Sequence, residues 1–348
     1  MTTYSKYRQL WESALTTNYG HAFPVHLDLE MMATCNLRCT MCPHSTGFVG
    51  RNEPGMSHST GMRVMKEARK LGALSVKFNW RSEATLYKRL NDLADYAKEL
   101  GYVDIMMNTN GNWPGGFFPS PSFTWISFSV DAATKETYEK IRTRGDWDRL
   151  LKNIERTYRM WPYDFGLPPN PTCDCGGSGI YKAPHQSVEG HDDEDAWVDW
   201  SCYCRHAHGT IPQTKRMVCS FTIQEINKCE VEQFRSLCHD QLGHQISTSI
   251  KPVFDRITGN TPDTDRKFCG FPLQRLTVAR SGDVFPCCVP WNENKDLSLG
   301  NVHSDSIKSI WNGERRRKLI DTLRTPASGW CDTCRNQCYS WASYEKGE

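Results

Sequence analysis

Three cysteines within one short run, Cys35, Cys39 and Cys42, constrain this chain more than any other feature. Thiols at this Cys-x3-Cys-x2-Cys spacing can bind three corners of a four-iron cluster and leave its fourth iron open. A closed structural site uses all of its ligand positions, whereas an open one can take a substrate or cofactor. The alternatives are zinc or a chance grouping in a Cys-rich chain, but the usual zinc signature is two Cys-x2-Cys pairs, which this run does not have.

The balance of charges bears on the partners of the protein. The chain has 348 residues, with 42 basic and 40 acidic side chains. This balance gives no strong field that would attract nucleic acid or an anionic membrane, so we expect neither partner.

The first residues, 1–11, are polar, and no apolar stretch approaches the roughly 18 residues that span a bilayer. Many of the 16 cysteines cluster at metal-ligand spacings, which favours reduced, metal-bound thiols in a soluble, cytoplasmic protein.

Strand-like and helix-like segments alternate along most of the chain. The apolar pattern predicts strands over 23–30, 75–79, 104–108, 125–130, 215–223 and 247–253. It predicts helices over 61–71, 86–100, 135–141, 150–158 and 231–242. This alternation indicates a parallel sheet with crossover helices, and the pattern alone permits an open doubly wound sheet or a partial barrel.

Two changes in composition divide the chain. The alternation stops over about 166–212, where Pro, Gly, Cys, His and Asp dominate and no period survives, so this segment is interpreted as an insertion. From residue 258 the composition shifts again toward a Cys-rich tail. We therefore expect an N-terminal lead over 1–22, an α/β unit over 23–257 and a separate domain over 258–348.

The insertion has its own candidate metal ligands, the thiol pairs Cys173, Cys175 and Cys202, Cys204, with several histidines nearby. Two thiol pairs can form a tetrahedral zinc site that folds a segment poor in apolar residues. The alternatives are an additional iron–sulfur cluster, or a lid with free thiols.

The cysteine run and the segments after the predicted strands resemble the radical S-adenosylmethionine (SAM) enzymes. The resemblance implies an α/β fold with a partial (β/α)6 TIM-like barrel, followed by a Cys-rich auxiliary-cluster domain. In that family the open iron of a 4Fe-4S cluster chelates SAM, and the reduced cluster cleaves it to a 5'-deoxyadenosyl radical.

The resemblance also implies SAM-binding residues, because ligands of parallel α/β folds gather where the strands end. Glu83 matches the acid of the family's Gly-Glu-Pro segment, although Ser82 and Ala84 depart from that pattern. The whole predicted set is Glu83, Asn110, Ser129, Asp131 and Arg142. The alternative for Glu83 and Arg142 is that they are solvated surface charges.

The tail resembles the twitch and SPASM extensions of the family, in which a Cys-x(9–15)-Gly-x4-Cys hairpin and a later Cys-x2-Cys hold an auxiliary cluster. The matching cysteines are Cys269, Cys287, Cys331 and Cys334. The hairpin is expected over 276–285, and a turn with two helices over 300–324. A full SPASM domain needs about four further ligands, and the tail offers only Cys288 and Cys338, so we expect one auxiliary 4Fe-4S cluster in a shorter, twitch-like form. A structural zinc is the alternative.

Together these features predict a radical SAM oxidoreductase that takes hydrogen from a small or carbohydrate-like substrate, with an electron donor such as flavodoxin or ferredoxin. Only about 22 residues precede the first strand, fewer than a separate peptide-recognition domain contains. Two alternatives stay open: an enzyme that modifies ribosomal peptides, and a non-catalytic iron–sulfur electron carrier or zinc-bearing interaction protein.

Overall fold

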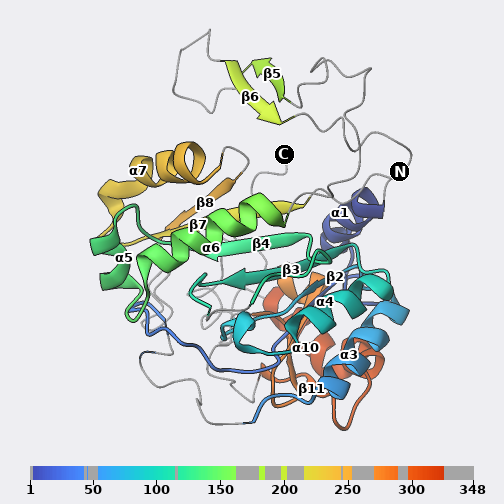
Figure 1. Cartoon of the computed structure of the whole chain (residues 1–348). Coiled ribbons are helices and arrows are strands. Elements are labelled where there is room, and N and C mark those ends of the chain that lie inside the picture. Colours follow the sequence, from blue (N-terminus) through green and yellow to red (C-terminus); the bar gives the residue numbers. More distant parts are fainter. Residues whose placement is uncertain are drawn as a thin grey trace.

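The computed structural model describes residues 3–42, 45, 54–113, 117–161, 180–184, 197–201, 215–243, 246–252, 270–288 and 297–324. Its main sheet contains six strands that run parallel in chain order (Figure 1): β1 (His26–Leu29), β2 (Ser75–Lys77), β3 (Asp104–Thr109), β4 (Trp125–Ser129), β7 (Arg216–Ile223) and β8 (Ser247–Pro252). In a doubly wound sheet the order of the strands reverses at a switch point. The order of these six strands does not reverse. The predicted partial barrel is therefore confirmed, as a sheet that is not closed.

One face of the sheet carries the apolar core. Leu27, Val76, Ile105 and Ile126 on successive strands are each at most 1% exposed and share one cluster with helix side chains. The crossover elements are α3 (His58–Leu71), α4 (Leu90–Glu99), α5 (Lys135–Ile141), α6 (Trp147–Met160) and α7 (Val231–Ser236), which continues as a π-helical turn over Leu237–Leu242. Alternate residues of each strand point to the opposite face, which is free to carry polar side chains.

Side-chain caps fix where several helices begin. The Ser57 hydroxyl accepts a hydrogen bond from the Thr60 amide at the start of α3, at 3.1 Å. The Asp146 carboxylate accepts one from Arg149 at the start of α6, at 2.9 Å. Such caps satisfy amides that have no partner within the helix, and each contributes about 1 kcal/mol.

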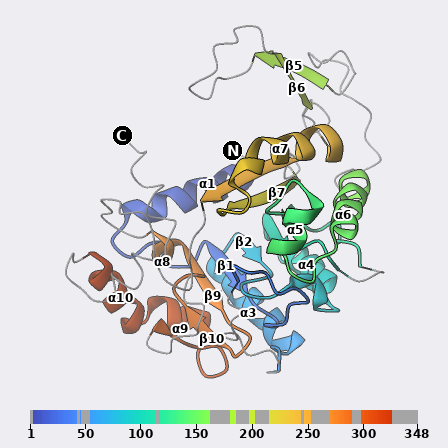
Figure 2. The same ribbon diagram turned by 90° about the vertical axis from the view of Figure 1, so that its left-hand side faces the viewer.

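The tail hairpin joins the barrel sheet. β9 (Arg275–Val278) pairs in parallel with β1, and β10 (Asp283–Phe285) and β11 (Gly300–Asn301) continue the sheet as antiparallel strands. The predicted hairpin and the two helices after it, α9 (Ile307–Asn312) and α10 (Glu314–Arg324), are present. The hairpin lies beside the first strand of the barrel, and Figure 2 shows α9 and β10 next to β9.

Helix α1 (Thr3–Ser13) and a pair of strands in the insertion were not predicted. Helix α1 lies in the expected lead, and its Tyr7 packs with Val25, Leu74 and Val103, which directly precede β1, β2 and β3. Within the insertion, where we expected no regular structure, β5 (Ile180–Pro184) and β6 (Trp197–Ser201) form an antiparallel pair. Among the described residues, no helix combines the length and apolarity needed to cross a membrane.

The pairing of β9 with β1 predicts that hairpin and barrel unfold together. Leu276 is fully buried in the same core as Leu27, so Leu276→Ala should lower the free energy of unfolding by about 2–5 kcal/mol. Chemical denaturation followed by circular dichroism should show one transition at a lower midpoint. Ile226→Ala, at a residue 47% exposed, is the matched control and should change stability by less than about 0.5 kcal/mol. A separate early transition in Leu276→Ala would contradict the joint sheet.

Candidate functional site

The loop with the three cysteines follows β1 and is anchored on α5. The Arg38 amide donates to the Thr143 carbonyl and the Thr40 amide to the Ile141 carbonyl, each at 2.9 Å. The Cys42 amide closes a turn onto the Cys39 carbonyl at 3.0 Å. The backbone of this loop is thus fixed at the edge of the sheet where the parallel strands end.

The three thiols lie within electrostatic reach of one another. Cys39 is buried, and Cys35 and Cys42 are partly buried. Burial, and after it the neighbouring Glu83 carboxylate, raises the pKa of Cys35 to about 12, with smaller contributions from Cys39 and Cys42. Burial also raises the pKa of Cys39, against the opposing effect of Arg142. Thiolates at such positions need a cationic partner, which bound iron supplies.

Two of the thiols receive hydrogen-bond donors from other elements, one from the turn after β3 and one from the end of α5. The Asn110 side-chain amide donates to Cys35 Sγ at 3.8 Å and to Asn36 Oδ1 at 2.8 Å. Arg142 Nη1 donates to Cys39 Sγ at 3.4 Å. Such donors stabilise iron-bound thiolates, so this donor set fits a cluster held by three cysteines. Within the described ranges no three His, Cys, Asp or Glu side chains meet around a single ion.

Glu83 is buried, not a solvated surface charge. Its Oε1 accepts hydrogen bonds from the Thr85 amide at 3.2 Å and from the hydroxyls of Thr85 and Thr109 at 2.7 Å, and its Oε2 accepts from the Asn110 amide at 2.7 Å. Burial raises the pKa of Glu83, and these donors oppose that shift. The carboxylate therefore ties the segment after β2 to the turn after β3 that presents Asn110 to Cys35.

Gly111 completes that turn, because its φ of 70° lies in the left-handed region and an added Cβ would collide with Leu150.

Arg142 is likewise held inside the protein. Its Nη2 forms an ion pair with Asp131 Oδ2, and its buried Nε has no hydrogen-bond partner among the described residues. Burial alone would lower the pKa of Arg142, but Asp131 and Cys39 outweigh it and raise the pKa. The guanidinium therefore stays charged between a carboxylate and a thiol.

Asp131 adopts a strained backbone conformation at the end of β4. Its φ is 60°, a left-handed value that costs a non-glycine residue roughly 1–2 kcal/mol. The neighbouring strand stabilises it: the Thr222 amide donates to its Oδ1 at 2.6 Å, and the Asn227 side chain donates to its carbonyl at 2.8 Å. The Asn227 side chain forms no hydrogen bond that caps the short helix after it. Strain of this kind is concentrated at functional sites.

Of the other predicted residues, some lie within the described part of the chain and the rest lie outside it. Ser129 is partly exposed at the end of β4, in register with Ser220 of β7. Cys287 is buried at 2% exposure, two residues after the end of β10. The remaining candidate ligands lie outside the described residues: Cys173, Cys175, Cys202, Cys204, Cys269, Cys331 and Cys334.

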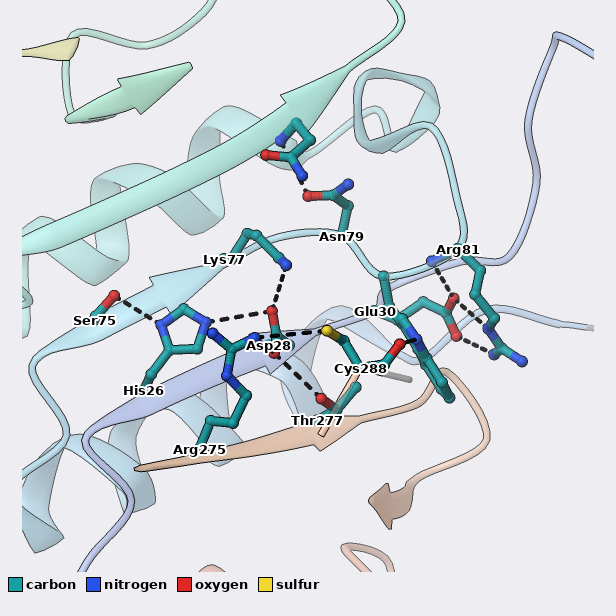
Figure 3. A network of polar contacts seen from close by, with 12 residues as sticks. His26, Asp28, Glu30, Ser75, Lys77, Asn79, Arg81, Arg275, Thr277 and Cys288 are labelled. Atoms are coloured by element: carbon teal, nitrogen blue, oxygen red, sulfur yellow. Dashed lines mark hydrogen bonds and ion pairs between the residues drawn. The ribbon is translucent and has the colours of Figure 1, made fainter. Parts of the chain in front are cut away.

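Sequence reasoning missed a contact between the two halves of the chain. The Trp80 indole donates to the Cys288 carbonyl at 2.6 Å and packs against Phe285, with ring centroids 5.3 Å apart. The Arg81 guanidinium lies over the same indole, 4.0 Å from its centroid, and pairs with Glu30 (Figure 3). The segment that contains Glu83 is therefore bound to the tail hairpin. The only sequence signal was the position of Trp80 beside Glu83.

Comparison with known proteins identifies two families within the chain. Residues 29–165 match the radical SAM superfamily, and residues 269–339 match the SPASM iron–sulfur cluster-binding domain. The probable GTP 3',8-cyclase of Saccharolobus solfataricus is 31% identical over 146 residues, which cover 41% of this chain and 45% of that protein. The chain thus spans less than half the length of the curated relatives it matches.

Solved structures share the fold. SuiB of Streptococcus suis, bound to the precursor peptide SuiA, superposes with a TM-score of 0.58 at 12% identity and covers 96% of this chain and 75% of its own. Native anSMEcpe with bound AdoMet gives a TM-score of 0.53 at 12% identity, with 90% and 89% covered. At such identities the likeness shows the fold alone.

The ion pair at the site predicts a specific loss of stability. Arg142→Met leaves the Asp131 carboxylate buried without its cation and should cost about 3–5 kcal/mol in urea unfolding. Arg142→Lys keeps the charge and should cost less. Lys140→Met, which removes an exposed pair with Glu136 on the same helix, is the control and should cost at most about 1 kcal/mol. Equal losses in Arg142→Met and Lys140→Met would show that the buried pair is not important for the fold.

Proposed function

The chain belongs to the radical SAM superfamily, and from this premise we propose that it cleaves SAM reductively and takes a hydrogen atom from a small or carbohydrate-like substrate. The observation that carries the proposal is the three-cysteine loop, where donors from the turn after β3 and from the end of α5 reach two of the thiols. When bound, a reduced 4Fe-4S cluster supplies the electron that splits SAM into methionine and a 5'-deoxyadenosyl radical.

The side chains at the strand ends have distinct roles in this proposal. Cys35, Cys39 and Cys42 hold the cluster, and the Asn110 amide and the Arg142 guanidinium orient and stabilise two of these thiolates. Asp131 keeps Arg142 in place, while Glu83 fixes the turn of Asn110. The proposed SAM-binding set consists of Glu83, Asn110, Ser129, Asp131 and Arg142.

The tail is proposed to hold the second cluster on Cys269, Cys287, Cys331 and Cys334, and the family match over 269–339 supports this assignment. In this role it accepts the second electron from the substrate. The proposal has two remaining parts: a zinc site on the four insertion cysteines, and a flavodoxin or ferredoxin as electron donor.

The curated relatives favour a small substrate. They are named for a reaction of GTP, a small molecule, and their similarity lies in the radical SAM portion of the chain. The peptide seen with SuiB belongs to a protein related by fold alone, so it does not by itself favour the peptide-modifying alternative.

Production of 5'-deoxyadenosine tests the proposal. Anaerobically reconstituted protein should form it from SAM and dithionite, and the variant with Cys35, Cys39 and Cys42 all changed to Ala should form none. Cys229→Ala removes an exposed thiol elsewhere and should keep full activity. Unchanged product in the triple variant would rule out the three-cysteine cluster. No product from the wild type would favour the electron carrier or interaction protein.

SAM affinity tests the binding set separately. Glu83→Gln removes the charge that organises the Asn110 turn, and Arg142→Lys removes the planar guanidinium, so each should weaken SAM binding by about 1.5–3 kcal/mol, or roughly ten- to a hundredfold. Equilibrium dialysis on reconstituted protein measures this change. Glu136→Gln, on the exposed side of α5, is the control. Wild-type affinity in both variants would remove Glu83 and Arg142 from the binding set.

A further inference from the structure

The face of the sheet opposite the apolar core carries many polar side chains. Register places Lys77 of β2 beside Met106 of β3, Asn108 beside Ser127 of β4, and Ser129 beside Ser220 of β7. These residues alternate with the core residues of the same strands, so they share the inner face of the partial barrel.

A charged group occupies the part of this face formed by β1, β2 and β9 (Figure 3). Lys77 Nζ lies 2.7 Å from Asp28 Oδ1, and Arg275 Nη1 lies 3.3 Å from Asp28 Oδ2. The Thr277 hydroxyl donates to the same oxygen at 3.2 Å, and His26 Nε2 lies 3.3 Å from Oδ1. Two cationic side chains thus converge on one buried carboxylate.

The group carries an excess of positive charge. Burial lowers the pKa of His26, which is therefore neutral near pH 7. Burial would raise the pKa of Asp28, but Lys77 and Arg275 hold it well below its ordinary value, so Asp28 contributes one negative charge. Glu30, the next acid on this face, is already paired with Arg81. One carboxylate therefore faces two cations.

Both cations are partly exposed, although the Arg275 guanidinium also lies over the Phe271 ring, 4.3 Å from its centroid. The side chains of Lys77 and Arg275 are 17% and 13% exposed, whereas that of Asp28 is fully buried. The Nε of Arg275 is buried without a hydrogen-bond partner among the described residues, and its Nη1 also contacts Cys288 Sγ at 3.6 Å.

Neutral polar side chains line the neighbouring inner face. Asn108 is exposed although it lies within β3, and Ser129 and Ser220 are partly exposed. Hydroxyl and amide groups suit a polyhydroxylated molecule, because each can donate and accept hydrogen bonds. Lys77 ends β2, directly before the segment that contains Trp80 and Glu83.

We propose that Lys77 and Arg275 form a subsite for the oxyanion group, phosphate or carboxylate, of a hydroxylated substrate whose body lies along Asn108 and Ser220. This inference rests on the proposed function and specifies its substrate class. Charged and hydrogen-bonded groups on one rigid sheet hold such a substrate in a fixed orientation.

Lys77→Met is a direct test, because Asp28 keeps Arg275, Thr277 and His26 as partners. The full chain, reconstituted and saturated with SAM, is titrated calorimetrically with glucose 6-phosphate, gluconate, inorganic phosphate and glucose. The wild type should bind at least one charged sugar roughly ten- to a hundredfold more tightly than glucose. The stronger of glucose 6-phosphate and gluconate identifies the oxyanion.

Lys77→Met should abolish this preference for charge and Lys77→Arg should restore it. Lys98→Met, at an exposed position of α4, is the matched control and should bind as the wild type does. If Lys77→Met fails to fold, the double variant Lys77→Arg/Arg275→Lys is titrated instead. It keeps both positive charges, so it should still bind the charged probes more tightly than glucose. A wild type that binds no charged probe more tightly than glucose, or a folded Lys77→Met that keeps the preference, overturns the subsite.

The outcome is separable from that of the proposed function. Formation of 5'-deoxyadenosine without any preference for charged probes would refute the subsite and leave the proposed function standing. A charge preference in a protein that forms no 5'-deoxyadenosine would refute the proposed function instead.

Discussion

The buried ion pair between Asp131 and Arg142 is the interaction on which the site depends. It joins the end of β4 to the end of α5, and the same guanidinium donates to Cys39 Sγ at 3.4 Å. Two charges removed from water are stable only when their remaining hydrogen-bonding groups are also satisfied. The Thr222 amide donates to the carboxylate and Arg142 Nη1 donates to the Cys39 thiol, so that Arg142 Nε is left without a partner among the described residues. The cysteine loop therefore has an anchor that would be costly to break.

A second set of contacts holds the opposite side of the same loop. Glu83 binds the turn of Asn110, which reaches Cys35, and Trp80, three residues earlier in the chain, binds the tail hairpin through the Cys288 carbonyl. The parallel order of the strands brings these residues together, because their carboxyl ends meet at one edge. The segment after β2 thus contacts both places where clusters are proposed.

Much of this arrangement could be predicted from the sequence. Alternating apolar patterns are local, so they located the six strands. Two of the predicted residues, Asn110 after β3 and Arg142 at the end of α5, both reach the cysteine loop. The pairing of β9 with β1 has no local signal, because about 250 residues separate the two strands. The left-handed backbone of Asp131 and the contact of Arg142 with Cys39 likewise arise from packing. Lys77 was predicted only as part of a strand, since its partner Arg275 lies far away in the chain.

The central claim is that the three cysteines hold a cluster whose open iron binds SAM. Electron–nuclear double resonance on the reduced protein, with SAM labelled by ¹⁵N at the amino group and ¹⁷O at the carboxylate, measures that contact directly. The account predicts hyperfine coupling from both labels in the wild type and in a variant whose Cys287 is changed to Ala. It predicts no coupling in the variant that lacks Cys35, Cys39 and Cys42. A reduced wild-type cluster that shows no coupling to either label would contradict the claim.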